Sequence, residues 1–196
     1  KRQQEYADGI VSASQAVSGL VGDILDLASV EAGLLELDMA SLDLHICLAE
    51  TMQLVGERAR HKKLKLQFDC PLDIGWIEAD ERRLKQCLLH VLGNAITFSS
   101  SGGILQISAT RNSSGVKIDI SDTGIGIPKV DIERVFKGFE RGDGADSLKP
   151  GAGLGLTLVR AFMELQGGRV EIASKPNQGT TVSLILPDEK TPDAPL

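Results

Sequence analysis

Residues 116–128 read VKIDISDTGIGIP, an alternating apolar segment that runs directly into a glycine-rich turn. Alternate side chains of a strand share one face, and here that face carries Val116, Ile118, Ile120 and Asp122. Its apolar members predict burial, so we expect Asp122 to point into the protein. A buried carboxylate needs a donor, and the exocyclic amine of adenine is one that no side chain of the sequence obviously replaces.

Two glycines follow this carboxylate in the same turn. Gly124 and Gly126 carry no Cβ, so they would let a ligand approach the backbone closely. The alternative is a structural turn in which Asp122 caps the glycines that follow it. The segment therefore predicts an adenine site, with a plain turn as the competing interpretation.

A second glycine cluster, GAGLG at residues 151–155, opens directly into an amphipathic helix. Backbone amides at a helix N-terminus bind phosphate. The sequence has no Gly-x-x-x-x-Gly-Lys stretch, and the cluster lacks the spacing and the early position of dinucleotide-binding loops. We therefore expect phosphates to be held here in some other way.

A helix predicted over Glu81–Phe98 carries a polar stripe beside its apolar face, formed by His90, Asn94 and Thr97. Asn94 offers a neutral oxygen. Mg²⁺ uses only one or two protein oxygens together with phosphates and water, so one well-placed Asn can hold it. The alternative is that Asn94 is an ordinary cap or solvated residue.

The remaining pattern predicts an α/β (α+β) two-layer sandwich, in which helices cover one face of a mixed sheet. Helices are expected over 45–63, 81–98, near 129–136 and over 154–165, and strands over 64–68, 75–77, 104–110, 116–121, 170–174 and 181–186. The last four strands form two antiparallel hairpins. Residues 34–187 are predicted to form this domain, and the polar tail 188–196 to be disordered.

Residues 1–33 are expected to form a separate element, a long helix over Arg2–Glu31. Two sets of apolar positions repeat every seven residues: Ile10, Val17 and Ile24, and between them Ala13, Leu20 and Leu27. This heptad seam predicts a homodimer, or a bundle with an upstream helix that the sequence lacks. The alternative is that the seam packs on its own domain.

Charge and composition exclude several classes. The net charge of −6 argues against a nucleic-acid partner. Three cysteines without metal-ligand spacing, and no apolar run long enough to span a membrane, favour a cytoplasmic location with reduced thiols and without membrane contact in these residues. The first residue is not methionine, which suggests a fragment whose parent protein could still be membrane-anchored.

Together these residues resemble the ATP-binding domain of sensor histidine kinases, which has the Bergerat (GHKL) fold. The segments that carry the resemblance are LGNA (92–95) for the N box, DTGIGIP (122–128) for G1, FKGF (136–139) for the F box, GAGLGL (151–156) for G2 and GTT (179–181) at the end. Residues 26–33 are similar to the end of the second helix in the family's dimerisation hairpin. The resemblance covers nearly the whole chain.

The resemblance implies a role for each matching residue. Asp122 would read the adenine amine with Gly124, Gly126 and Thr180 around it, and Asn94 would hold Mg²⁺. Gly151, Gly153, Leu154 and Gly155 would form the phosphate side of a mobile lid, in which Arg141 and Lys149 either contact phosphates or are plain solvated charges. The reaction implied is transfer of the γ-phosphoryl group of MgATP to a histidine in an absent upstream helix, with a response regulator receiver domain as partner.

Two positions depart from the family pattern. His90 stands where a first N-box Asn is expected, and Thr97 stands where a Lys is usual. The sequence therefore lacks the cation that this Lys would place beside the triphosphate. His90 either compensates as a catalytic group or is a structural replacement. The second hypothesis is therefore a weakened pseudokinase that acts as a signalling module, similar to the alphaproteobacterial DivL-like branch. A chaperone or mismatch-repair ATPase would need a Glu at position 90 as its general base.

Overall fold

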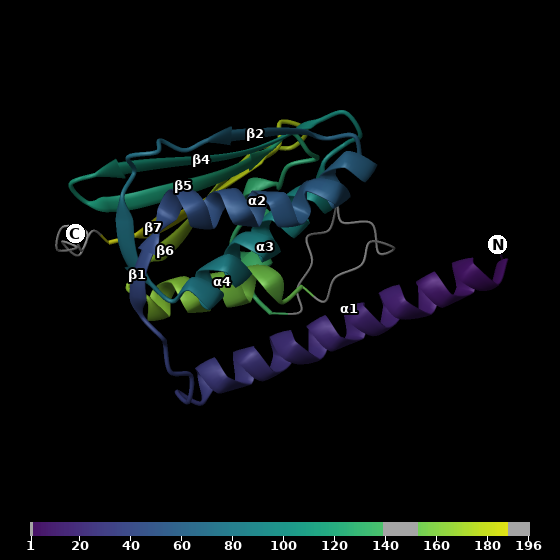
Figure 1. The fold of residues 1–196 in the computed structure, drawn as a ribbon, viewed down its shortest axis with the longest axis horizontal. Helices are drawn as coiled ribbons and strands as arrows, with labels where there is room; N and C mark the ends of the chain where they lie inside the picture. The colour runs from purple at the N-terminus through teal and green to yellow at the C-terminus, as the bar shows by residue number, and fades with distance from the viewer. Residues whose placement is uncertain (1, 139–152, 188–196) are drawn as a thin grey trace. The chain divides into compact units, whose positions relative to one another are not determined.

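The computed structural model describes residues 2–138 and 153–187 (Figure 1). The chain divides into two compact units, Lys1–Glu36 and Leu37–Leu196. No helix within the described ranges is both long and apolar enough to cross a membrane.

The first unit consists of one helix, α1 (Arg2–Glu31), with the bounds that its heptad pattern predicts. The chain leaves the helix through Gly33, whose φ of 65° is the left-handed conformation that glycine adopts easily. One row of the seam is open to solvent, since Ile10, Val17 and Ile24 are 70%, 60% and 43% exposed. The homodimer remains a prediction.

The second unit is built on a five-stranded sheet in the order β2-β4-β5-β7-β6. Its strands are β2 (Lys65–Asp69), β4 (Ile104–Asn112), β5 (Gly115–Asp122), β6 (Arg169–Ser174) and β7 (Thr180–Leu186). Strand β2 runs parallel to β4 and the other neighbours are antiparallel, so the sheet is mixed. Both predicted hairpins, β4–β5 and β6–β7, are confirmed.

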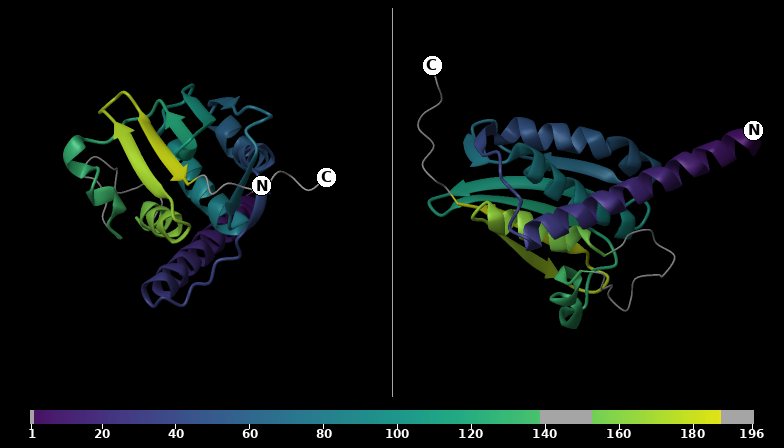
Figure 2. Two further views of the ribbon diagram at one scale, coloured as in Figure 1. Left: turned by 90° about the vertical axis from the view of Figure 1, so that its left-hand side faces the viewer. Right: turned by 90° about the horizontal axis from the view of Figure 1, so that it is seen from below.

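Three helices cover one face of this sheet, as Figures 1 and 2 show: α2 (Leu44–His61), α3 (Glu81–Phe98) and α4 (Gly155–Leu165). The core between the two layers is aliphatic, with side chains such as Ile107, Ile118 and Leu158 fully buried. Asp80 caps α3 through a 3.0 Å bond from the Arg83 N–H. The predicted fold class is confirmed.

Two local predictions were wrong. No strand was expected before residue 64, but Ala40–Asp43 forms strand β1, which pairs antiparallel with β3 (Trp76–Ala79) in a small separate sheet. The helix expected near 129–136 is instead two 3₁₀ turns, Lys129–Asp131 and Arg134–Phe136. The segment is too short to sustain an α-helix, and Phe136 is its one buried apolar anchor.

All three cysteines are free thiols. Cys47 and Cys87 lie in the core, where burial raises the pKa of the Cys47 thiol to about 11 and that of Cys87 to about 12. These thiols therefore stay protonated and behave as small apolar side chains.

Candidate functional site

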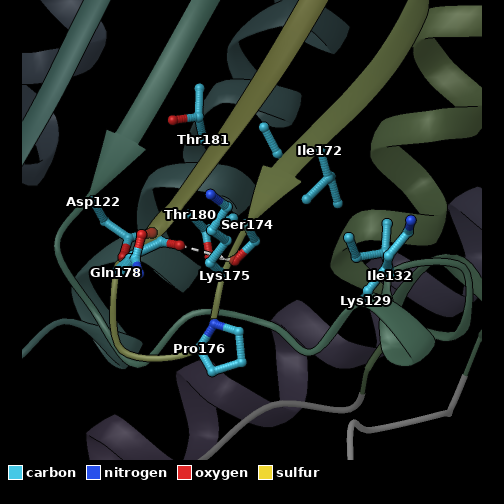
Figure 3. A pocket seen from close by; sticks show the side chains of 12 residues that line it. Asp122, Lys129, Ile132, Ile172, Ser174, Lys175, Pro176, Gln178, Thr180 and Thr181 are labelled. Atoms are coloured by element: carbon cyan, nitrogen blue, oxygen red, sulfur yellow. Dashed lines mark hydrogen bonds between the residues drawn. The ribbon is translucent and has the colours of Figure 1, made fainter.

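The site begins with three polar side chains in one row across the sheet. Thr180 in β7 lies directly opposite Asp122 in β5 on one side and Ser174 in β6 on the other, so the three side chains share a face. The next row on that face is apolar and contains Ile120, Val182 and Ile172. Figure 3 shows the three side chains of this row among those that line a pocket.

Asp122 is half-buried on the helix-facing side, as strand parity predicts. Burial raises the pKa of its carboxyl, and hydrogen bonds from the backbone N–H groups of Gly124 and Thr180 offset this only in part. The Gly124 N–H donates to Asp122 Oδ1 at 2.7 Å. The carboxylate thus has backbone donors of its own, which an inventory of side chains could not reveal.

The glycines around Asp122 are required by close backbone approach. A Cβ on Gly179 would lie 1.9 Å from the Asp122 carbonyl oxygen, and one on Gly126 would lie 2.0 Å from that of Lys175. A Cβ on Gly124 would meet the Phe98 carbonyl oxygen at 2.6 Å. Protein backbone, rather than open space, therefore accounts for Gly124 and Gly126, and their contact with a ligand remains a prediction.

A pocket of about 550 Å³ opens beside this row. Of the residues predicted from sequence, Asp122 and Thr180 line it. Sequence reasoning missed several further lining residues: Lys129, Ile132, Ile172, Ser174, Lys175 and Gln178. For Ile172 and Ser174 a signal existed, because alternation along β6 places both on the face of the sheet that carries Asp122.

The polar stripe of α3 divides into separate environments. Asn94 is half-buried, and its amide makes no hydrogen bond within residues 2–138 and 153–187. The Thr97 hydroxyl donates to the Gly93 carbonyl oxygen at 2.7 Å, within its own helix. Asn94 therefore has a polar group available for a ligand.

His90 faces the beginning of α4. A Cβ on Gly155 would lie 3.2 Å from His90 Nδ1, so the imidazole packs against the first residue of that helix. Leu154 precedes α4 without a side-chain cap, and Gly153 has a φ of 74°. The cap residue therefore offers no side-chain acceptor to the first-turn amides of α4. Amides that no side chain caps are the groups that bind phosphate at a helix N-terminus.

The chain just before residues 139–152 lies against α4. Thr157 donates to the Phe136 carbonyl oxygen at 3.0 Å, and the Arg160 guanidinium lies 3.7 Å above the centre of the Phe136 ring. The predicted site residues Arg141, Lys149 and Gly151 lie outside the described residues.

Comparison with protein families agrees with this geometry. The family model described as histidine kinase-, DNA gyrase B- and HSP90-like ATPase matches residues 79–190. The chain is 35% identical over 186 residues to the histidine protein kinase DivJ of Caulobacter vibrioides, covering 95% of this chain and 31% of DivJ. It is 32% identical over 197 residues to the sensor protein DivL of the same organism, covering 99% of this chain and 25% of DivL.

Two solved structures share the fold. Full-length ShkA in complex with AMPPNP aligns with a TM-score of 0.80 at 29% identity, over 95% of this chain and 39% of that one. The histidine kinase ThkA in complex with the response regulator TrrA aligns with a TM-score of 0.69 at 22% identity, over 91% and 50% of the two chains. The second likeness supports the fold alone.

The chain therefore belongs to the histidine kinase-, DNA gyrase B- and HSP90-like ATPases. Within this family it is the catalytic, ATP-binding domain of the two-component sensor histidine kinases, preceded by a helical segment. This confirms the predicted function at the level of the domain. The chain spans 31% and 25% of the lengths of DivJ and DivL, so the activity and partners of the whole protein are matters of proposal.

Proposed function

We propose that the pocket beside Asp122 binds the adenine of ATP, with the carboxylate accepting a hydrogen bond from the exocyclic amine. The observation that carries this proposal is a half-buried acceptor at the end of a cavity whose walls include Ile132 and Ile172. Apolar walls with a few placed polar groups are typical of sites for flat ligands. The hydroxyl of Thr180, next to Asp122 in the row, is the second polar group in this part of the cavity.

The phosphates would then lie between α3 and the beginning of α4. Asn94 fits as a ligand of Mg²⁺, because its half-buried amide oxygen is of the type that the ion accepts and has no hydrogen-bond partner in the described part of the chain. Amides at Gly153, Leu154 and Gly155 would hold the phosphates. When bound, Mg²⁺ would neutralise charge on the phosphates. Gly151, Arg141 and Lys149 are proposed to complete this side.

For the whole protein we propose γ-phosphoryl transfer to a histidine in an upstream helix, in a homodimer joined through α1, with a response regulator receiver domain as partner. The exposed heptad seam supports the dimer. The kinase ThkA, which shares the fold, has been solved in complex with the response regulator TrrA, an arrangement that we extend to this chain as part of the proposal. A cytoplasmic location of the domain belongs to the same proposal.

A second candidate is a catalytically weakened pseudokinase of the DivL-like type. It is favoured by the environment of Thr97, whose hydroxyl is bonded within α3, and by His90, which packs on Gly155 as a structural side chain would. Identity does not separate the branches, because DivJ and DivL are similarly related to the chain. In this candidate a bound nucleotide sets conformation and is not consumed.

Calorimetric titration with AMPPNP, with and without Mg²⁺, tests the proposal. We expect binding that Mg²⁺ strengthens in the native chain and leaves unchanged in Asn94→Ala. No measurable binding under either condition would remove the nucleotide proposal. Binding without Mg²⁺ dependence would keep the adenine site and reject the metal role of Asn94.

A further inference from the structure

The hydroxyl of Ser174 is surrounded by three hydrogen-bond partners. It accepts the Ile127 N–H at 2.7 Å, it donates to the Gly179 carbonyl oxygen at 2.9 Å, and it lies 2.9 Å from Thr180 Oγ1. The residue thereby joins the turn after Asp122 to the β6–β7 turn. Figure 3 shows Ser174 and Thr180 side by side among the residues that line the pocket.

One arrangement of the protons makes all three contacts hydrogen bonds. A serine hydroxyl has one proton and two lone pairs. The Gly179 carbonyl can only accept, so the Ser174 proton goes there. The Ile127 N–H can only donate, which uses one lone pair. In this arrangement the second lone pair accepts the proton of the Thr180 hydroxyl.

Thr180 Oγ1 consequently has only lone pairs left for the cavity that it lines. Its cross-strand neighbour Asp122 is also an acceptor, and directly opposed Cβ atoms of neighbouring strands are about 5 Å apart. Two acceptors thus stand next to each other at the polar end of the pocket. An amino group with two hydrogens matches them, whereas a carbonyl oxygen would be repelled by both.

We propose that Ser174 is a positioning residue that sets the base specificity of the pocket. By accepting the Thr180 proton it keeps Oγ1 an acceptor, so that the pocket selects a purine with a 6-amino group over one with a 6-oxo group. This inference rests on the proposed adenine site. It assigns to Ser174 a role that the motifs around Asp122 and Gly179 do not contain.

Calorimetric binding of ADP and IDP to the native chain and to Ser174→Ala tests this role, because the two nucleotides differ only at the base. We expect the native chain to prefer ADP by at least about ten-fold. In the variant, the Thr180 hydroxyl is released and can donate to a 6-oxo group, so the preference should fall by about three- to ten-fold, the effect of one hydrogen bond. A merely structural role would weaken both nucleotides equally and leave the ratio unchanged.

Two further variants sharpen the test. Ser174→Thr keeps the hydroxyl and should retain the native ratio. Ser183→Ala removes a hydroxyl on the opposite face of β7, where it donates to Asp119 Oδ1 at 2.5 Å, and should also retain it. Thermal unfolding of each variant checks that it is folded.

The outcomes separate this inference from the proposed function. If the native chain binds ADP and the ratio is the same in Ser174→Ala, the role of Ser174 is refuted and the adenine site stands. Equal binding of ADP and IDP by the native chain would refute the specificity role alone. Failure of the native chain to bind either nucleotide would overturn both.

Discussion

The ammonium group of Lys62 donates to the carbonyl oxygen of Thr97 at 2.6 Å and also to that of Ile96. Both carbonyls belong to the last turn of α3, where backbone acceptors lack helical partners and the helix dipole favours a cation. Lys62, at the end of α2, thus stabilises the end of the helix that carries Asn94.

Lys62→Met should lower the free energy of unfolding by about 1–2 kcal/mol, because two carbonyls lose a charged donor. Urea denaturation measures the change. Lys65→Met is the matched control, since Lys65 is exposed and its side chain has no bond in the described part of the chain. Equal effects of the two substitutions would contradict the role of Lys62.

Gly179→Ala should be strongly destabilising, by more than about 2 kcal/mol, because it combines a positive φ of 87° with a contact of 1.9 Å to the Asp122 carbonyl oxygen. Gly56→Ala, in the middle of α2 with nothing within 4 Å of the new Cβ, should instead stabilise by about 0.5–1 kcal/mol. Thermal unfolding of the pair provides the comparison. A tolerated alanine at position 179 would refute the close approach of the two backbones.

Thr97→Lys should tighten the binding of AMPPNP by about three- to ten-fold, and more at low salt, if position 97 faces the phosphates as proposed. Thr97→Gln, which also loses the bond to Gly93 but adds no charge, is the control. Binding measured at two salt concentrations distinguishes them. If Thr97→Lys and Thr97→Gln bind AMPPNP with the same affinity at both salt concentrations, position 97 does not face the phosphates.

The raised pKa of Asp122 predicts a pH dependence of stability. The folded chain holds this proton more tightly than the unfolded chain, so stability is lost as the pH rises above the ordinary value of 3.8 and until the folded carboxyl has ionised. The Asp122→Asn variant has no carboxyl at this position, so its stability does not fall in this way. Its unfolding free energy relative to the native chain should therefore increase over that window and then level off, and a difference independent of pH would argue against burial as the cause.

Local features of the sequence were sufficient for most of the fold. The bounds of α3 follow from the cap at Asp80 and a strong apolar face, and the direction of Asp122 follows from alternation along β5. Strand β1 was missed because it is only four residues long and its pairing partner, β3, is distant in the sequence. Such pairing leaves no periodic signal in so short a segment.

The site was predictable where a single segment carries it, and less so where segments meet. Asp122 and Thr180 were found, but the role of Ser174 depends on the register between β6 and β7 and on the approach of Ile127. The same holds for Gly126 and Gly179, whose neighbours are distant backbone atoms. Contacts of this kind arise from tertiary structure, and spacing in the sequence does not encode them.

The central claim is that Asp122 accepts the amine of adenine, and calorimetric binding of ADP to Asp122→Asn tests it most directly. Asp119→Asn is the control, because Asp119 lies on the opposite face of the same strand, bonded to Lys117 and Ser183. We predict that Asp122→Asn loses about 10- to 100-fold in affinity, the effect of a hydrogen bond to a charged acceptor, while Asp119→Asn binds as the native chain does. Native-like affinity in a folded Asp122→Asn variant would contradict the claim.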